Sequence, residues 1–299
     1  MRFGIMDMQI DALIPPGLSP EEMGEHIVNF DHAALVRQLH GYGFNLIELG
    51  GDLALFIPQT FHPSAIERLA ALKAEAGLDY TVHLPLWSVE PSTPLDPVRL
   101  GSLQAVVNIV KATLPLEPEM YVFHATGALA AEFYQMRLPE LGKSLILKQF
   151  QNKACESLQT ILAETGIPSR QLAIETIEFP FELTFELAER LDLSMCLDTG
   201  HVLVGFSGPV ELFEVLELCL PRLGEIHLHD GPWQGPERAI GYGKDHAPLG
   251  AGDLDVARLL DRLTRANFTG PIIFELTVEE ALVSLNTIDS LRPEVLSRR

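Results

Sequence analysis

Residues 171–201 read QLAIETIEFPFELTFELAERLDLSMCLDTGH, and this stretch contains the unit that decides the fold. An apolar run over Gln171–Ile177 is followed by a segment of helical period and then by a second apolar run over Leu193–Thr199. Short apolar runs separated by helical segments are typical of parallel β–α–β units. The stretch therefore predicts a strand, a helix and a second strand parallel to the first.

The same alternation continues in both directions along the chain of 299 residues. Helical stretches lie between the runs, among them Ala65–Gly77, Lys143–Thr165 and Leu254–Ala266. Eight such units predict a single-domain (β/α)₈ barrel, a TIM barrel of the α/β class over residues 1–299. An open doubly wound sheet is the alternative, but MDMQIDAL after the first strand lacks the GxGxxG pattern. The expected strands are Arg2–Met8, Asn45–Gly50, Tyr80–Leu86, Met120–Thr126, Gln171–Ile177, Leu193–Thr199, Leu223–His229 and Pro271–Leu276.

Composition narrows the classes of function. The chain has 41 acidic and 21 basic residues, a formal net charge of −20, and such a field repels polyanions. Long nucleic acid is therefore not the expected partner. With 47% hydrophobic residues, no secretory leader at the N-terminus and no apolar window of membrane length, the sequence predicts a soluble cytoplasmic protein without a membrane partner. The oligomeric state stays open.

Histidine and carboxylate residues collect where the predicted strands end. In a barrel the carboxyl ends of all strands meet at one mouth, and the loops that follow them form the functional rim. A polar side chain enclosed in such a strand needs a partner or a role. The residues in question are His83, His124, Glu175, Asp198, His201, His227, His229, Asp230 and Glu275, with Asp245 and His246 in the loop after the seventh strand.

This mixture of imidazoles and carboxylates predicts a metal site at the mouth. Such ligands suit zinc, manganese, cobalt or iron. Carboxylates such as Glu175, Asp198 and Glu275 would repel one another if crowded together, and a divalent cation relieves that repulsion. A hydrogen-bonded polar rim without metal is the alternative interpretation.

At these positions the sequence resembles the xylose isomerase-like TIM barrel superfamily, which includes sugar isomerases, sugar epimerases and endonuclease IV. The resemblance extends from the first strand to the eighth. In the isomerase and epimerase members one metal is held by a Glu, an Asp, a His and a Glu. The resemblance implies these roles for Glu175 in IET, Asp198 in LDTGH, His227 in EIHLHD and Glu275 in IIFEL.

Endonuclease IV holds three zinc ions with a larger set of ligands. The resemblance implies that its additional ligands correspond to His83, His124, His201 and His246. One position departs from that pattern, because the Asp expected two residues before the last His is Lys244 here, while Asp245 is adjacent. The expected number of ions is therefore one to three.

A narrower resemblance is to the cobamide-remodelling phosphodiesterases of the same superfamily. The stretches YTVHLPL, IETIEFPFE, LDTGHVLVGFSG and EIHLHD, followed by KDH, are similar to that branch. This resemblance implies hydrolysis of the phosphodiester in the nucleotide loop of a corrinoid.

Two chemistries are open at such a rim, and the first is the preferred hypothesis. Metal-dependent hydrolysis of a phosphodiester in a small, cobamide-like molecule would use all eight ligands. Isomerisation or epimerisation of a sugar or sugar phosphate would use one metal, with Glu175 and Glu275 as the catalytic pair that moves protons at carbon. A non-catalytic binding barrel is the third possibility.

The residues that bind the substrate are expected in the loop Asp230–Gly252. Trp233 and Tyr242 in this loop are candidates to cover a compact ligand, and Arg238 and Lys244 to meet a phosphate. The partner is thus expected to be a small molecule, either phosphorylated or a sugar. The predicted substrate-binding residues are His229, Asp230, Lys244 and Asp245.

Overall fold

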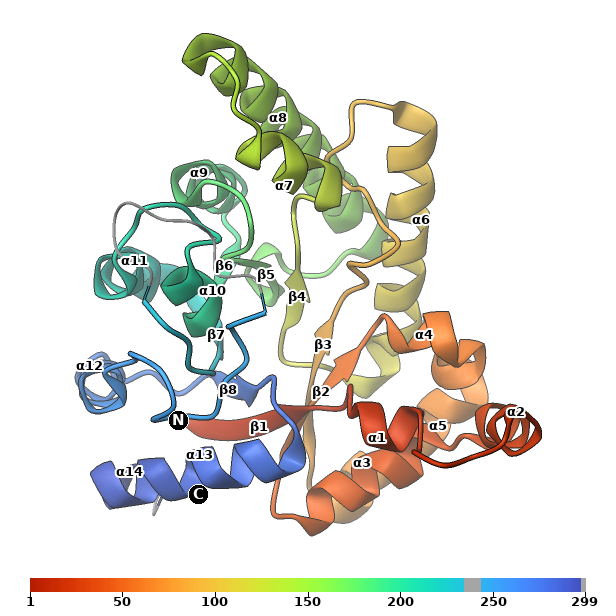
Figure 1. Cartoon of the computed structure of the whole chain (residues 1–299). Coiled ribbons are helices and arrows are strands. Elements are labelled where there is room, and N and C mark those ends of the chain that lie inside the picture. Colours follow the sequence, from red (N-terminus) through yellow and green to blue (C-terminus); the bar gives the residue numbers. More distant parts are fainter. Residues whose placement is uncertain (234–242, 297–299) are drawn as a thin grey trace.

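The computed structural model describes residues 1–233 and 243–296 of the chain. In this part eight parallel strands follow one another in chain order and close into a barrel through the pairing of β1 with β8 (Figure 1). The (β/α)₈ barrel predicted from the sequence is thereby confirmed. The strands are β1 (Arg2–Met6), β2 (Leu46–Gly50), β3 (Asp79–His83), β4 (Tyr121–Phe123), β5 (Leu172–Glu175), β6 (Ser194–Asp198), β7 (Leu223–His227) and β8 (Pro271–Phe274).

Helices connect the strands and cover the outside of the barrel (Figure 1). The three helices named from the sequence are present as α5, α8 and α12, with ends that differ by a few residues. Within the described residues, no helix combines the length and apolar character that a membrane crossing requires. The helices are α1 (Ile10–Leu13), α2 (Pro20–Asn29), α3 (His32–Gly41), α4 (Leu53–Phe56), α5 (Pro63–Ala76), α6 (Asp96–Thr113), α7 (Ala128–Gln135), α8 (Glu140–Thr165), α9 (Phe181–Leu191), α10 (Thr199–Val204), α11 (Leu212–Cys219), α12 (Val256–Arg265), α13 (Val278–Leu291) and α14 (Pro293–Leu296).

Most strands end earlier than the apolar pattern predicts. β5 ends at Glu175 rather than at Ile177, and β4 ends at Phe123 rather than at Thr126. Beyond these ends only single backbone bonds to the neighbouring strand continue, such as that from the N–H of Thr176 to the carbonyl of Cys196 at 3.1 Å, and the apolar side chains that follow pack elsewhere. Ile177, for example, belongs to a separate apolar cluster with Phe179 and Phe150.

Polar contacts across the barrel show which side chains face its interior. Thr81 Oγ1 on β3 donates to Glu225 Oε1 on β7 at 3.1 Å, although these strands are not neighbours. Side chains alternate along a strand, so the residues two positions later, His83 and His227, also face inward but one layer nearer the mouth. This alternation places the polar residues of several strands in one layer at the carboxyl ends.

Candidate metal centre

The carboxylate of Glu175 lies at the middle of the mouth, between two sets of imidazoles. Its Oε2 is 2.9 Å from His124 Nε2 and 3.1 Å from His83 Nε2. Its Oε1 is 3.1 Å from His201 Nδ1 and 3.4 Å from His227 Nδ1. Glu175 is only 1% exposed. Each oxygen of this one carboxylate therefore belongs to a different group of ligand atoms.

The first group consists of His83, His124 and Glu175, and the second of Glu175, Asp198, His227 and Glu275. In each group the ligand atoms lie within 4.8 Å of one another. His227 Nδ1 is 3.2 Å from Glu275 Oε1 and 3.8 Å from Asp198 Oδ2. Yet this nitrogen and Glu175 Oε1 are buried without a hydrogen bond. Buried orphan atoms that converge on one point fit a divalent cation with nitrogen and oxygen ligands.

Backbone carbonyls accept hydrogen bonds from three of the imidazoles, and that from His201 Nδ1 to the carbonyl of Thr176 is the longest at 3.2 Å. His83 Nδ1 donates to the carbonyl of Leu84 at 2.9 Å, and His246 Nδ1 donates to the carbonyl of Glu275 at 3.0 Å. Each of these last two rings then presents Nε2 to the ligand groups. Metal-ligating histidines are usually held by such a bond on the second nitrogen, so both rings have the orientation of a ligand.

A third group forms around His201 and His246. His246 Nε2 is 3.1 Å from Asp245 Oδ2, and His201 Nε2 is 3.8 Å from the same oxygen. The backbone of His246 adopts a left-handed conformation with φ of 55°. Asp245 thus lies against both imidazoles, although the Asp of the endonuclease IV pattern stands one residue earlier in the sequence.

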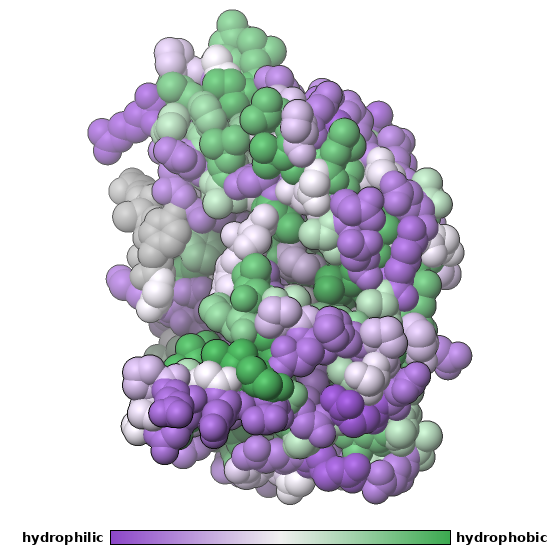
Figure 2. Space-filling view, turned by 90° about the vertical axis from the view of Figure 1, so that its right-hand side faces the viewer, coloured by the Kyte–Doolittle hydropathy of each residue, from purple (hydrophilic) through white to green (hydrophobic). Residues whose placement is uncertain are grey.

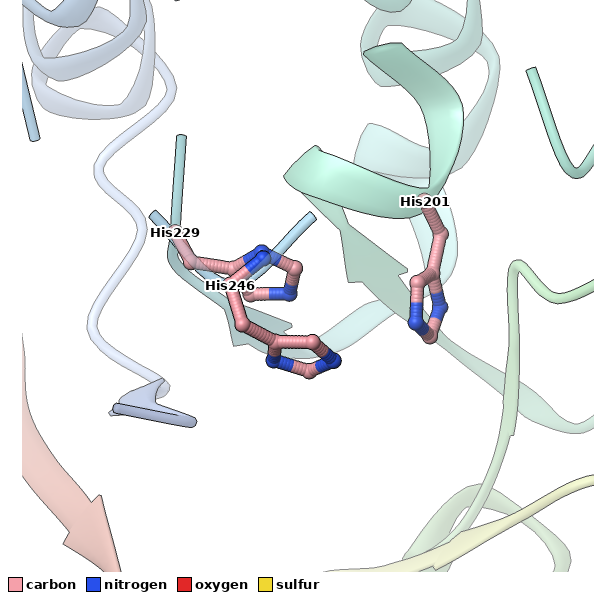
Figure 3. Close-up of side chains that lie close together, drawn as sticks. All are labelled: His201, His229 and His246. Carbon is pink, nitrogen blue, oxygen red and sulfur yellow. The ribbon is translucent and has the colours of Figure 1, made fainter. Parts of the chain in front are cut away.

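His229 supports this arrangement through contacts with the protein on both nitrogens. Its Nε2 donates to Asp198 Oδ2 at 2.8 Å, and its Nδ1 accepts from the backbone N–H of His246 at 2.8 Å. Its ring is stacked on that of His246 with a centroid distance of 4.2 Å. Figure 3 shows these two rings and the side chain of His201, which comes from α10. These contacts suit a residue that positions Asp198 and His246.

The sequence LDTGH brings two ligands together because β6 passes directly into α10. Asp198 is the N-cap of α10, and its Oδ1 accepts from the backbone N–H of His201 at 2.6 Å. A Cβ on Gly200 would lie 2.1 Å from Nδ1 of His229. Only glycine therefore lets the buried imidazole of His229 pack against this turn.

Asp230 and Lys244 have different surroundings from the other predicted site residues. Asp230 is fully buried, and its two oxygens accept from the backbone N–H groups of Gly231, Gly250 and Leu254. It thereby holds the two ends of the loop that carries His246. Lys244 is exposed. Arg238 and Tyr242 lie outside the described residues.

Two buried carboxylates beneath the mouth are absent from the predicted site. Glu48 Oε2 lies 3.3 Å from His227 Nε2, on the side of the ring opposite the ligand group. Burial, with the nearby Glu48 as a smaller cause, raises the pKa of Glu225 well above its usual value. The signal was present, since IELGG and GEIH each place a carboxylate inside a predicted strand.

The carboxylates and imidazoles of the centre shift one another's pKa values. Burial alone lowers the pKa of His83, but the carboxylate of Glu175 outweighs it and raises this pKa to about 9. His201 follows the same pattern beside Asp198 and Glu175, with a pKa of about 10. Burial raises the pKa of Glu175, but the charges of His124 and His227 outweigh it and hold that pKa well below its usual value. The raised pKa values of His83 and His201 favour protons on these two rings, and a bound metal ion would take the place of such protons.

The mouth opens into a cavity of about 470 Å³. Glu175, His83 and His124 line its floor, together with Glu275 and His246. Most of the ligand atoms are thus within reach of a molecule bound in the cavity. Such a concave, partly apolar space beside convergent polar groups is typical of a small-molecule site.

Comparison with known proteins shows a relationship over most of the chain. The model of a family described as xylose isomerase-like TIM barrel matches residues 36–294. The chain is 21% identical over 289 residues to the uncharacterized protein MJ1311 of Methanocaldococcus jannaschii, covering 92% of this chain and 83% of that protein.

Solved structures share the fold at low sequence identity. A D-tagatose 3-epimerase-like protein superposes with a TM-score of 0.71 at 17% identity, covering 100% of this chain and 99% of the other. Endonuclease IV from Thermus thermophilus superposes with a TM-score of 0.61 at 18% identity, covering 98% of this chain and 100% of the other. At these identities the likeness is one of fold.

Proposed function

The chain belongs to the xylose isomerase-like TIM barrel family, and from that premise we propose that it is a divalent-metal-dependent enzyme that hydrolyses a phosphodiester in a small molecule. The position of Glu175 carries this proposal. Its Oε2 faces His83 and His124, while its Oε1 faces His201 and His227. A carboxylate placed in this way is suited to bridge two metal positions, which an enzyme that uses one metal does not need.

The proposed roles follow from the three groups. Zinc, manganese, iron or cobalt bound there would polarise phosphoryl oxygens and activate a water. Glu275 is the carboxylate placed to accept a proton, because its side chain is 11% exposed and lines the cavity. His83 and His246 are held in ligand orientation by backbone carbonyls. The phosphodiester in the nucleotide loop of a corrinoid is the specific substrate that the sequence resemblance suggests.

Epimerisation of a sugar is the second candidate. It is favoured by the second group alone, in which Glu175 and Glu275 both approach His227 Nδ1, at 3.4 and 3.2 Å. Two carboxylates beside one metal could move protons to and from a carbon. The fold likeness to a D-tagatose 3-epimerase-like protein is compatible with it. This candidate assigns no chemistry to His83 and His124.

Metal analysis combined with two assays tests the proposal. The purified protein is expected to hold more than one metal ion per chain and to hydrolyse bis(p-nitrophenyl) phosphate, with loss of activity on chelation and recovery on metal addition. Deuterium incorporation from solvent is measured in parallel on a panel of ketohexoses. One ion per chain with deuterium incorporation would favour the epimerase, and full hydrolysis without metal would refute both.

The variant His124→Ala separates the two candidates within one protein. It removes a ligand of the first group and leaves all four of the second. If the enzyme is the hydrolase, we expect this variant to lose about one ion per chain and most of its activity. If it is the epimerase, the ion and the deuterium exchange are retained. His62→Ala is the control, because His62 is exposed, N-caps α5 and belongs neither to the cavity lining nor to a ligand group.

A further inference from the structure

The cavity has two unlike sides. We call the lining residues of metal-ligand type its floor and the other lining residues, which are mostly apolar, its wall. Figure 2 shows one face of the molecule hollowed near its middle, with apolar residues beside the hollow. Because floor and wall belong to one cavity, a ligand that fills it contacts both. The apolar residues that line the cavity are Met6, Met8, Ile10, Leu86, Trp87 and Leu276.

The polar side chains on the wall are largely engaged by the protein. The amide nitrogen of Gln9 donates to two backbone carbonyls at 3.0 Å each, and its amide oxygen accepts from a backbone N–H at 3.1 Å. Glu280 Oε2 accepts from the N–H of Thr277 at 3.1 Å and from its hydroxyl at 2.7 Å. A ligand rich in hydroxyl groups would therefore replace few of the hydrogen bonds that it makes to water. The wall suits an apolar part of a ligand.

Trp87 is held at the rim of this wall as an open platform. It is 57% exposed although it lines the cavity. Phe56 packs edge-on against its ring at a centroid distance of 5.9 Å. Asp52 Oδ2 accepts from the backbone N–H groups of Leu86 at 2.8 Å and Trp87 at 3.4 Å. Phe56 thus contacts the indole and Asp52 holds its backbone, while more than half of the residue's surface stays exposed.

The charge around the cavity limits where a negative group can bind. Among the described residues that line it, none is Lys or Arg. The chain as a whole carries a formal charge of −20. An anionic ligand group would therefore need the cations of the metal centre, and the wall disfavours a further anionic group.

We propose that the substrate carries a planar aromatic ring on the same molecule as its reactive phosphodiester, and that this ring stacks on Trp87 over the apolar wall. The phosphodiester in this statement rests on the proposed function, whereas the ring site is defined by the wall. A nucleobase or a heterocycle of similar size is the chemical class, since such rings are flat, neutral and stack on indole. A long polynucleotide is disfavoured by the net charge.

Fluorescence of Trp87 tests ring binding directly. The chain has 2 tryptophans, so in a Trp233→Phe background Trp87 is the only one. Adenosine 5′-monophosphate is compared with ribose 5-phosphate, which has the same phosphate and sugar but lacks the base. We expect the nucleotide to quench Trp87 and to bind at least about ten-fold more tightly than the sugar phosphate. Equal affinities, or no quenching by the nucleotide, would overturn the proposal.

Variants of Trp87 test whether the expected preference for the nucleotide over the sugar phosphate depends on the ring of this residue. Trp87→Ala is expected to weaken nucleotide binding about ten-fold and to leave ribose 5-phosphate binding unchanged, while Trp87→Phe keeps most of the affinity. Trp233→Ala is the matched control, because Trp233 is also exposed but does not line the cavity. Equal loss with both ligands, or equal loss in the two alanine variants, would contradict the proposal.

Failure of this inference is distinguishable from failure of the proposed function. The binding test needs no turnover, and the hydrolysis assay with bis(p-nitrophenyl) phosphate needs no preference for a nucleotide. Nucleotide-specific quenching without hydrolysis would support the ring site and reject the hydrolase. Hydrolysis without a difference between the two ligands would support the hydrolase and reject the ring site.

Discussion

The two sides of the barrel mouth use their polar groups in opposite ways. On the ligand side, Glu175 Oε1 and His227 Nδ1 are buried without a hydrogen bond. On the apolar side, Gln9 and Glu280 bond to their own loops. An unsatisfied buried polar group costs about 1–3 kcal/mol, so it persists where an ion or ligand can pair with it. The contrast supports placing the reacting group of the substrate on the ligand side and its neutral part on the apolar side.

Removing the carboxylate of Glu175, which the ligand groups share, should have the largest effect on the ligand side. Glu175→Gln keeps the size of the side chain but removes the charge that several imidazoles share. We expect metal content per chain to fall and hydrolytic activity to drop on the order of a thousand-fold or more, because metal activation of water is lost. Metal analysis and steady-state kinetics measure both effects.

Glu280→Gln is the matched control for Glu175→Gln, on the apolar side of the same cavity. A glutamine at this position can still form the capping box with Thr277 at the start of α13. Metal content and activity should therefore stay within a few-fold of the unchanged protein. Equal losses in the two variants would show that the sides do not differ as we describe.

Removing a carboxylate from the layer of side chains beneath the ligands should reduce metal binding less than the loss of the Glu175 carboxylate does, but by a measurable amount. Glu48 lies 3.3 Å from Nε2 of His227, so it is placed to hold the ring with Nδ1 toward the second group. Glu48→Gln is expected to weaken metal affinity by roughly 10–100-fold. Competition with a chromophoric chelator gives the affinity independently of activity. Glu225→Gln is the control, since this buried carboxyl lies in the same layer and burial raises its pKa well above its usual value; a similar loss there would assign the effect to packing.

The fold could be predicted from the sequence because parallel barrel strands are enclosed on both faces. That enclosure produces short apolar runs such as LAIETI and SMCLD, separated by helical segments. Strand ends were less accurate, because an apolar side chain packs equally well in a ladder or in a satellite cluster. Ile177 was assigned to a strand for this reason but packs with Phe179.

The candidate site was predictable only in part. Ligand-type residues at strand ends could be found because the carboxyl ends of all strands converge. Contacts between distant segments could not, so the approach of Asp245 to His201 and the contact of Glu48 with His227 emerge only from the structure. Residue type alone also could not separate Asp230, whose oxygens organise a loop, from a substrate ligand.

Adding a methyl group where the ligand side is closely packed, at Gly200, is expected to lower stability moderately. In Gly200→Ala the added Cβ would meet the buried ring of His229, which also bonds to Asp198. We expect a loss of about 1–3 kcal/mol in the free energy of unfolding, measured with denaturant. Gly24→Ala in α2 meets no atom within 4 Å, so this control should be neutral or slightly stabilising. Equal destabilisation of both variants would contradict the predicted clash.

The smallest effect is a pH dependence at the edge of the ligand side. Burial raises the pKa of Glu178 to about 7, with a weaker opposing contribution from His201. Between its ordinary pKa and this value the folded state holds more protons than the unfolded state, so this group lowers stability as pH rises through that range. Glu178→Gln should match the unchanged protein at pH about 4 and be slightly more stable at pH about 8. Urea midpoints of both proteins at the two pH values measure the difference. Because the carboxyl is half-exposed, solvent screening keeps the expected gain small.

A Glu178→Gln variant that is less stable than the unchanged protein at the higher pH would contradict this prediction. It would show that the charged carboxylate is stabilised by its neighbours, and the ligand side would then extend to Glu178.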